Sequence, residues 1–326
     1  TYDKNGNITR IEHADGDVTY TYDNLGQLLT ETNAVLGLTY TYTYDKAGNI
    51  KTITTKNNST GYTYTQTLTY RSSGWGDQLT YFDYNEYEGT SLTYDTLGNI
   101  TSYSDLQRTY YLSWYGRQMT SFYSPGYNGD HPFNYTYDDE GRRVQKSTEG
   151  YIYTNYVYEG DLLVAEIQND YTLIFLYDGM GQPIGMLYKS TGSSTGEWQI
   201  FWYEKNLQGD VVAVYDNNGV KHVSYTYDAW GNTTETRHVN YTAASYNPIR
   251  YRGYYYDRDI GLYYLGTRWY STQFRRFLSP DNVDVTAATP GGLTDKNLYA
   301  YCDNNPVMRV DYTGEFWISA MLIGAA

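Results

Sequence analysis

Residues that often carry metal chemistry or covalent stability are scarce in this sequence. It contains one cysteine, Cys302, so no disulfide can form within the chain. The four histidines, His13, His131, His222 and His238, are far apart and lack the spacing of a metal site. We therefore predict that the protein uses neither a metal nor another cofactor.

Basic residues and long apolar runs are also scarce. The chain has 23 Lys and Arg against 37 Asp and Glu, a formal net charge of −14, and such a surface repels nucleic-acid phosphates. The most apolar run, Phe316–Ala326, is too short to span a membrane. Neither an H-E-x-x-H motif, a Walker phosphate loop nor paired C-x-x-C motifs occur. We predict no nucleic-acid partner and no membrane span in this segment.

Tyrosine, in contrast, is abundant, with 44 residues, and it alternates with threonine. The stretch Leu38–Thr54 reads LTYTYTYDKAGNIKTIT. In an extended strand its Tyr and Thr side chains lie on opposite faces, and both residue types favour strands. Asp45 and Gly48 occupy the first and fourth positions that a type I turn prefers, and alternation resumes at Ile50. The stretch therefore predicts a β-hairpin.

The same phrase recurs along the chain. A Tyr-Asp pair followed by Gly three residues after the Asp is found with its aspartate at Asp3, Asp23, Asp45, Asp95, Asp138, Asp178 and Asp228, and a weaker copy lies between the last two at Asp216. The intervals are about 20 residues or about twice that, which is typical of repeat proteins whose units cannot bury a face alone. Because Tyr hydroxyls require a partner or water, we predict an all-β fold with a large curved sheet that is wet or half-buried on both faces.

The pattern changes near Tyr246, where Arg becomes dense among aromatic residues. Such a mixture can bind single-stranded nucleic acid, but the nearby carboxylates and the overall acidity favour internal Arg–carboxylate pairs. We expect Arg250, Arg252 and Arg258 to pair with acidic residues of the core or of the repeat wall.

Residues 247–314 resemble the core domain that ends the repeat region of Rhs, or YD-repeat, proteins. The resemblance rests on RYRGYYYDRDIGLYYLGTRWY (Arg250–Tyr270), RRFLSPD (Arg275–Asp281) and NLYAYCDNNPVMRVDYTG (Asn297–Gly314), together with the upstream Tyr-Asp-x-x-Gly-Asn units. The chain also resembles the C component of bacterial insecticidal toxin complexes, the wall-associated proteins of Gram-positive bacteria and, more distantly, the teneurin shell.

The resemblance implies an architecture and a function. Residues 1–245 would be a spiral of YD-repeat hairpins forming part of a hollow β shell. Residues 246–315 would be the core domain that curls inward as a plug. Residues 316–326 would begin a variable C-terminal region, the toxin domain that the shell holds in cis. An immunity protein as a further partner, and a secreted, cell-surface or cell-wall location, follow from the same resemblance.

Many family members cut themselves after the core as aspartyl autoproteases. The resemblance assigns the two catalytic aspartates to Asp281 and Asp311 and the catalytic arginine to Arg268. Two neighbouring carboxyls can share one proton, so that one activates water while the other protonates the leaving group. The expected cleavage falls just after Gly314, at Glu315 or Phe316.

The sequence departs from the family pattern at three positions near these residues. Asn282 and Tyr312 stand where the family usually has Pro, and Glu315 stands where cleaving members have Leu. Since Pro presets a turn, its loss loosens the position of each carboxylate. Two alternatives therefore stay open. The core is an active protease, or Asp281 and Asp311 are only turn residues.

A second function, from a different class, is a non-enzymatic surface adhesin. Exposed Tyr-rich β surfaces can stack on sugar rings, which would make surface carbohydrate the partner. The sequence beyond Ala326 would discriminate the two functions: a short domain of different composition favours toxin delivery, and further repeats or an anchor favour adhesion.

Overall fold

A computed structural model describes residues 1–74, 76–84, 89–105, 107–126, 130–149, 152–192, 196–240, 242–281, 297–315 and 317–319. The described chain is built from β-strands, with short 3-10 turns between some of them, so the predicted all-β class is confirmed. Two compact units are present. Unit 1 comprises Thr1–Tyr111, Tyr227–Asn232 and Arg268–Ala326; unit 2 comprises Leu112–Thr226 and Thr233–Thr267.

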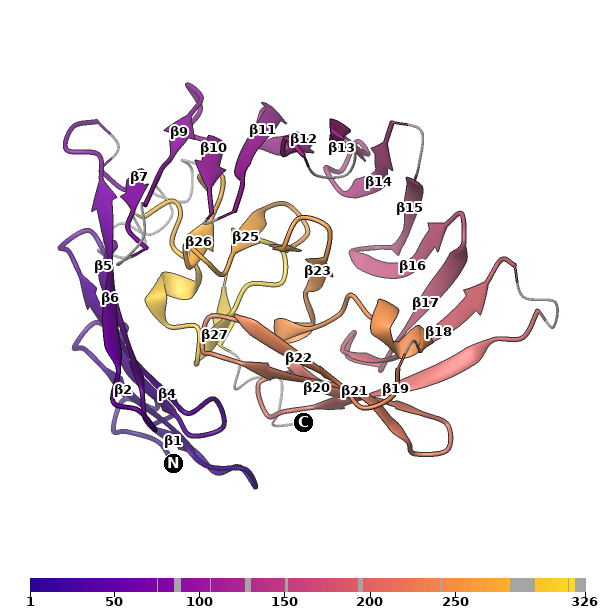
Figure 1. The fold of residues 1–326 in the computed structure, drawn as a ribbon, viewed down its shortest axis with the longest axis horizontal. Coiled ribbons are helices and arrows are strands. Elements are labelled where there is room, and N and C mark those ends of the chain that lie inside the picture. Colours follow the sequence, from indigo (N-terminus) through magenta and orange to yellow (C-terminus); the bar gives the residue numbers. More distant parts are fainter. Residues whose placement is uncertain are drawn as a thin grey trace. The chain divides into compact units, whose positions relative to one another are not determined.

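Unit 1 begins with an eight-stranded sheet in which the strands follow one another in chain order (Figure 1). Its strands are β1 (Arg10–Ile11), β2 (Val18–Tyr22), β3 (Leu28–Asn33), β4 (Leu38–Tyr44), β5 (Ile50–Asn57), β6 (Thr63–Tyr70), β7 (Leu79–Phe82) and β8 (Thr90–Ser91). The other elements of the unit are β9 (Thr93–Tyr94), β10 (Ile100–Ser104), β25 (Trp269–Ser271), β26 (Arg276–Phe277), η5 (Cys302–Asn304), β27 (Arg309–Val310) and β28 (Ile318–Ser319). Strand β11 (Thr109–Tyr115) begins in unit 1 and ends in unit 2.

The hairpin predicted from Leu38–Thr54 is present as β4 and β5. Thr43 lies opposite Thr52, and their hydroxyl oxygens are 2.6 Å apart on the exposed face. The Tyr face is drier than the composition suggested, because Tyr42 is only 1% exposed. The expectation of water or half-burial on both faces is therefore wrong for this hairpin, in which one face is exposed and the other is packed.

Among the described residues, the buried hydroxyl of Tyr42 has no hydrogen-bond partner, whereas the hydroxyls of tyrosines at the ends of the repeat strands do have one. Tyr44 donates to the Leu28 carbonyl at 2.6 Å, one hairpin back in the chain. Six other tyrosines donate to a main-chain carbonyl of an earlier strand or turn in the same way, at Tyr22, Tyr70, Tyr94, Tyr137, Tyr158 and Tyr177. A tyrosine whose hydroxyl has a protein partner can be buried without the cost of an unsatisfied polar group.

The Asp of each Tyr-Asp-x-x-Gly repeat accepts the hydrogen bonds that form its own turn. The Asp45 carboxylate accepts from the Ala47 and Asn49 backbone N–H groups at 2.8 and 2.9 Å, and from the Asn49 amide at 3.0 Å. Gly48 has a φ of 73°, a conformation that favours glycine. The strand register shifts between Thr43 and Tyr44, at the end of the hairpin. The turn that Asp45 and Gly48 predicted is therefore formed, and these two residues are its determinants.

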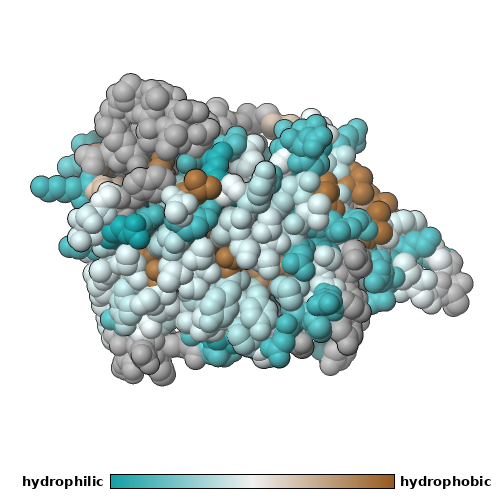
Figure 2. Space-filling model, turned by 90° about the horizontal axis from the view of Figure 1, so that it is seen from above, coloured by the Kyte–Doolittle hydropathy of each residue, from teal (hydrophilic) through white to brown (hydrophobic). Residues whose placement is uncertain are grey.

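Unit 2 contains an antiparallel meander whose strands follow one another in chain order from β12 to β22. Its strands are β12 (Gln118–Tyr123), β13 (Phe133–Tyr137), β14 (Arg143–Thr148), β15 (Ile152–Glu159), β16 (Leu162–Gln168), β17 (Tyr171–Tyr177), β18 (Pro183–Ser190), β19 (Gln199–Lys205), β20 (Val211–Asp216), β21 (Lys221–Tyr227) and β22 (Thr233–Arg237). It ends with η2 (Ala243–Tyr246), η3 (Tyr251–Gly253), β23 (Tyr255–Asp257) and β24 (Leu262–Tyr264). The surface shown in Figure 2 is mainly teal to white, with brown groups separated from one another.

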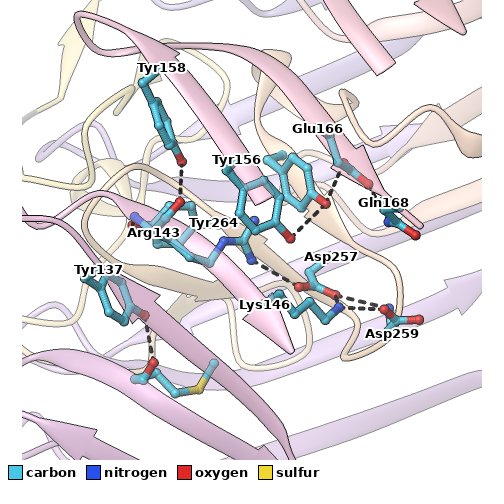
Figure 3. A network of polar contacts seen from close by, with 12 residues as sticks. Tyr137, Arg143, Lys146, Tyr156, Tyr158, Glu166, Gln168, Asp257, Asp259 and Tyr264 are labelled. Atoms are coloured by element: carbon cyan, nitrogen blue, oxygen red, sulfur yellow. Dashed lines mark hydrogen bonds and ion pairs between the residues drawn. The ribbon is translucent and has the colours of Figure 1, made fainter. Parts of the chain in front are cut away.

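A buried ionic network joins strands of unit 2 (Figure 3). Arg143 on β14 is fully buried, and its Nη1 donates to the Asp257 carboxylate on β23 at 3.1 Å. Lys146 bonds Asp257 at 2.6 Å and Asp259 at 2.5 Å. The Arg143 guanidinium also lies 4.1 Å from the ring centre of Tyr156, a cation–π distance. Arg143, Lys146 and Asp257 thus each contact an opposite charge, as burial requires.

The expected Arg–carboxylate pairs are confirmed for two of the three arginines named from the sequence. Arg250 contacts Glu235 at 2.9 Å, and Arg252 contacts Asp210 at 3.4 Å. The side chain of Arg258 donates to the Ser245 carbonyl, so its described hydrogen bond is to a neutral main-chain group.

Candidate functional site

The three residues that the family resemblance assigned to catalysis lie together in unit 1. Arg268 immediately precedes β25, Asp281 follows β26, and Asp311 directly follows β27. The Arg268 Nη2 atom is 2.9 Å from Asp281 Oδ2 and 3.6 Å from Asp311 Oδ2. A single guanidinium nitrogen therefore contacts both carboxylates and draws them to one place, although they are separated by 30 positions in the sequence.

The remaining nitrogens of Arg268 are also held. Its Nε donates to the Gly314 carbonyl, and its Nη1 donates to the Leu298 carbonyl at 3.2 Å. The guanidinium carbon lies 3.7 Å from the ring centre of Phe277. The Arg268 side chain is 4% exposed. A planar guanidinium with acceptors on three nitrogens has a fixed orientation, which a lysine could not reproduce.

The two carboxyls occupy different environments. The side chain of Asp311 is 4% exposed, whereas that of Asp281 is 12% exposed and lies nearer to Arg268. Burial raises the pKa of Asp311 above its ordinary value; Arg268 opposes the rise and the charge of Asp281 adds to it. The raised pKa favours Asp311 as the carboxyl that holds a proton.

The turn that contains the expected cleavage point is well formed. The Gly314 N–H donates to Asp311 Oδ1 at 2.8 Å, and Gly314 has a φ of 76°. This bond closes the Asp311–Gly314 turn even though Tyr312 stands where the family has Pro. Glu315 is exposed, while Asn282 and Phe316 lie outside the described residues.

The chemistry available here is acid–base chemistry next to a polarised carbonyl. Two neighbouring carboxyls in different environments can act as base and acid, and the Arg268 Nε–H points at the Gly314 carbonyl oxygen, where negative charge would develop. Within the described ranges, no group of three or more His, Cys, Asp and Glu residues could hold a metal ion.

Two contributors to the site were not identified from the sequence. The Leu298 carbonyl accepts hydrogen bonds from the Asp281 N–H at 2.8 Å and from Arg268. Phe277 supplies the ring beneath the guanidinium. A main-chain carbonyl has no residue type to recognise, and Phe277 is one aromatic residue among many, so neither had a detectable signal.

The sequence matches the model of a known protein family. The family model described as teneurin YD-shell matches residues 1–307. The chain belongs to this YD-shell family. It is a YD-repeat Rhs protein, as the motifs in its sequence had indicated.

The relatives of this YD-shell protein include bacterial toxins. It is 37% identical over 324 residues to the tRNA3(Ser)-specific nuclease WapA of Bacillus spizizenii, covering 97% of this chain and 12% of that protein. It is 30% identical over 130 residues to the toxin protein Tse5 of Pseudomonas aeruginosa, covering 40% of this chain and 9% of that protein. The present chain thus corresponds to a small part of these relatives.

A solved structure shows the same fold. The Tc holotoxin pore of Photorhabdus luminescens contains a chain that matches with a TM-score of 0.70 at 23% identity, over 96% of this chain and 16% of that one. At this level of identity the likeness concerns the fold alone.

Among the residues that the structure describes, no helix is long and apolar enough to cross a membrane.

Proposed function

We propose that this chain is the shell wall and core of a toxin-delivery protein, and that its core cuts the chain after Gly314 to release a C-terminal effector held in cis. The observation that carries the proposal is Arg268, which contacts both carboxylates and the carbonyl of the Gly314–Glu315 bond. The toxin relatives support the delivery role. A secreted or surface location and an immunity protein for the producing cell belong to the same proposal.

The proposed reaction is a single hydrolysis in cis. Ionised Asp281 removes a proton from a water molecule, and the water oxygen forms a bond to the Gly314 carbonyl carbon. Arg268 Nε–H stabilises the negative charge that develops on the carbonyl oxygen. Protonated Asp311 then donates its proton to the Glu315 nitrogen as the C–N bond breaks. One water is consumed, and the products are a Gly314 carboxylate and a new amino terminus at Glu315.

This mechanism needs one carboxylate base and one protonated carboxyl acid, so the rate has a bell-shaped dependence on pH. The raised pKa of Asp311 keeps its proton available at a higher pH than for an exposed aspartate. We expect cleavage to be fastest in the mildly acidic range and to fall as Asp311 loses its proton.

Intact-mass spectrometry tests the proposal on the chain extended through its natural downstream sequence. The wild type should give two masses whose sum is the whole chain plus one water. Asp281→Asn, Asp311→Asn and Arg268→Ala should each give one mass. Asp303→Asn is the matched control, since Asp303 pairs with Arg309 in the same unit and lies outside the Arg268 cluster; it should cut as the wild type does.

A wild-type chain that stays uncut from acidic to neutral pH would refute the protease. In that case Asp281 and Asp311 are structural residues, and the shell carries its cargo uncut. Circular dichroism of each variant must show the same β-sheet signal as the wild type, so that loss of cleavage is not loss of folding.

A cavity in unit 2 favours carbohydrate binding as a second candidate function. It measures about 680 Å³ and is lined by Tyr188, Trp198 and Tyr246, with Glu197 and Arg237 among the polar residues. The rings of Tyr188 and Tyr246 are stacked, with centroids 5.4 Å apart. Aromatic faces beside charged groups suit sugar rings.

A glycan array tests this second function independently of cleavage. The chain should bind defined glycans, and Trp198→Ala should abolish the signal. Trp202→Ala is the matched control, because Trp202 is similarly exposed and does not line the cavity. Absence of binding, or equal loss in both variants, would refute the adhesin.

A further inference from the structure

We propose that Asp77, in the loop between β6 and β7, is a positioning residue for the cleavage centre, through its hydrogen bond to Leu298. The inference rests on the proposed autoproteolysis. It gives a repeat-wall residue a role in a reaction whose other participants all belong to the core segment.

The contacts form a short chain from the wall to the catalytic residues. The Leu298 N–H donates to Asp77 Oδ2 at 3.1 Å. The carbonyl of the same residue accepts from the Asp281 N–H at 2.8 Å and from Arg268 Nη1 at 3.2 Å. Leu298 is therefore held on one side by Asp77 and on the other by the two residues that form the closer ion pair of the site.

Asp77 is itself fixed by the core. Its main-chain carbonyl accepts from Arg276 Nη2 at 2.7 Å. The Arg276 guanidinium lies 4.9 Å from the ring centre of Tyr299, the residue after Leu298, and 5.1 Å from that of Tyr70 at the end of β6. The carboxylate and the carbonyl of Asp77 thus both contact the core, so its position is determined by more than one bond.

The electrostatic consequence is specific. Without the Asp77 carboxylate, Leu298 is free to shift and Arg268 loses a fixed acceptor. Arg268 lowers the pKa of Asp311, so a displaced Arg268 neutralises this carboxyl less well and its pKa rises further. The pH–rate profile then moves to higher pH, a change that a general loss of stability does not produce.

The arrangement also sets an order of events. Asp77 precedes Arg268 by 191 positions (268 − 77), so the centre is complete only when the β6–β7 loop and the core have come together. Cleavage would follow closure of this part of the wall, and an effector would not be released from a chain whose wall is still open.

The test uses the full extended chain made by pulse-labelled cell-free synthesis, with cleavage followed by gel from about pH 4 to about pH 8. Asp77→Ala should slow cleavage about 10- to 100-fold and shift the profile to higher pH, because small misplacements have effects of this size. Asp77→Asn keeps an oxygen that can accept from the Leu298 N–H and should restore most of the rate and the wild-type profile.

Asp23→Ala is the matched control. Asp23 accepts two backbone N–H bonds within its own YD turn in unit 1, so its loss weakens the wall without touching Leu298. Its rate and profile should equal those of the wild type. A wild-type rate in Asp77→Ala, or a slow rate with an unshifted profile that Asp77→Asn does not rescue, would overturn the positioning role alone. An uncut wild type would overturn the proposed autoproteolysis and, with it, this inference.

Discussion

The stability of unit 1 should fall as the pH rises, because Glu31 is buried in its protonated form. Glu31 on β3 is 0% exposed. Its carboxyl oxygens accept from the Asn33 amide at 3.0 Å and from the Ala229 N–H at 2.8 Å. Burial, with the charge of Asp228, raises its pKa from 4.5 to about 8, although Arg275 and the two hydrogen bonds oppose the rise.

The sign and the size of this change in the free energy of unfolding follow from the linkage between protonation and folding. Between about pH 4.5 and about pH 8 the folded state binds a proton at Glu31 that the unfolded state has lost, so the free energy of unfolding decreases as pH rises. A difference of about 3.5 pKa units, at about 1.4 kcal/mol each, corresponds to about 5 kcal/mol above pH 8. The effect is fully absent below pH 4.5, where both states are protonated.

Glu31→Gln removes the titration while keeping the shape. The glutamine carbonyl can still accept from Ala229, but its amide faces the Asn33 amide, so the variant starts about 1 to 3 kcal/mol less stable at low pH. Its stability should then change less with pH than that of the wild type. At about pH 8 and above, the variant should equal or exceed the wild type.

Urea unfolding at a series of pH values, followed by the fluorescence of buried Trp230, measures this difference. Glu12→Gln is the matched control, since the Glu12 side chain is 76% exposed in the same unit. It should keep the wild-type pH dependence. Parallel pH dependence in wild type and Glu31→Gln would refute the reasoning and show that Glu31 is ionised in the folded protein.

Three further changes have definite expectations. Arg252→Ala should destabilise the protein by about 3–5 kcal/mol in urea unfolding, since it leaves the buried Asp210 carboxylate without its charge partner; Arg237→Ala, at a side chain 47% exposed, should cost about 0–1 kcal/mol. Tyr44→Phe should cost about 1–2 kcal/mol, because the Leu28 carbonyl loses its hydroxyl donor; an unchanged midpoint would show that water replaces it. Far-ultraviolet circular dichroism should show mainly β-structure, and a helical spectrum would contradict the fold.

Local structure could be predicted because its determinants are close together in the sequence. The β4–β5 hairpin follows from the alternation of Thr and Tyr, and its turn follows from Asp45 and Gly48, whose carboxylate and permissive backbone act within four residues. The sidedness of the strands was also predictable, since alternate residues must face opposite sides. Which side would be dry was not, because that depends on what packs against it.

The candidate site was predictable only through resemblance. Nothing in the spacing of Asp281 and Asp311 indicates that they meet; their proximity depends on Arg268, which binds both. The contributions of Leu298 and Asp77 were beyond any pattern, because one acts through main-chain atoms and the other comes from a distant loop.

The sequence by itself determined the repeat, the hairpins, the turns and the acidic balance of this protein, since these depend on residue type and short-range spacing. Only the tertiary structure decided which main-chain carbonyl accepts from a tyrosine such as Tyr44, and which carboxyl is buried deeply enough to keep a proton. It also decided that Asp77, in a wall loop, contacts Leu298, whose carbonyl accepts hydrogen bonds from both Arg268 and Asp281. These features depend on burial and on contacts between distant segments, and both arise only when the chain folds.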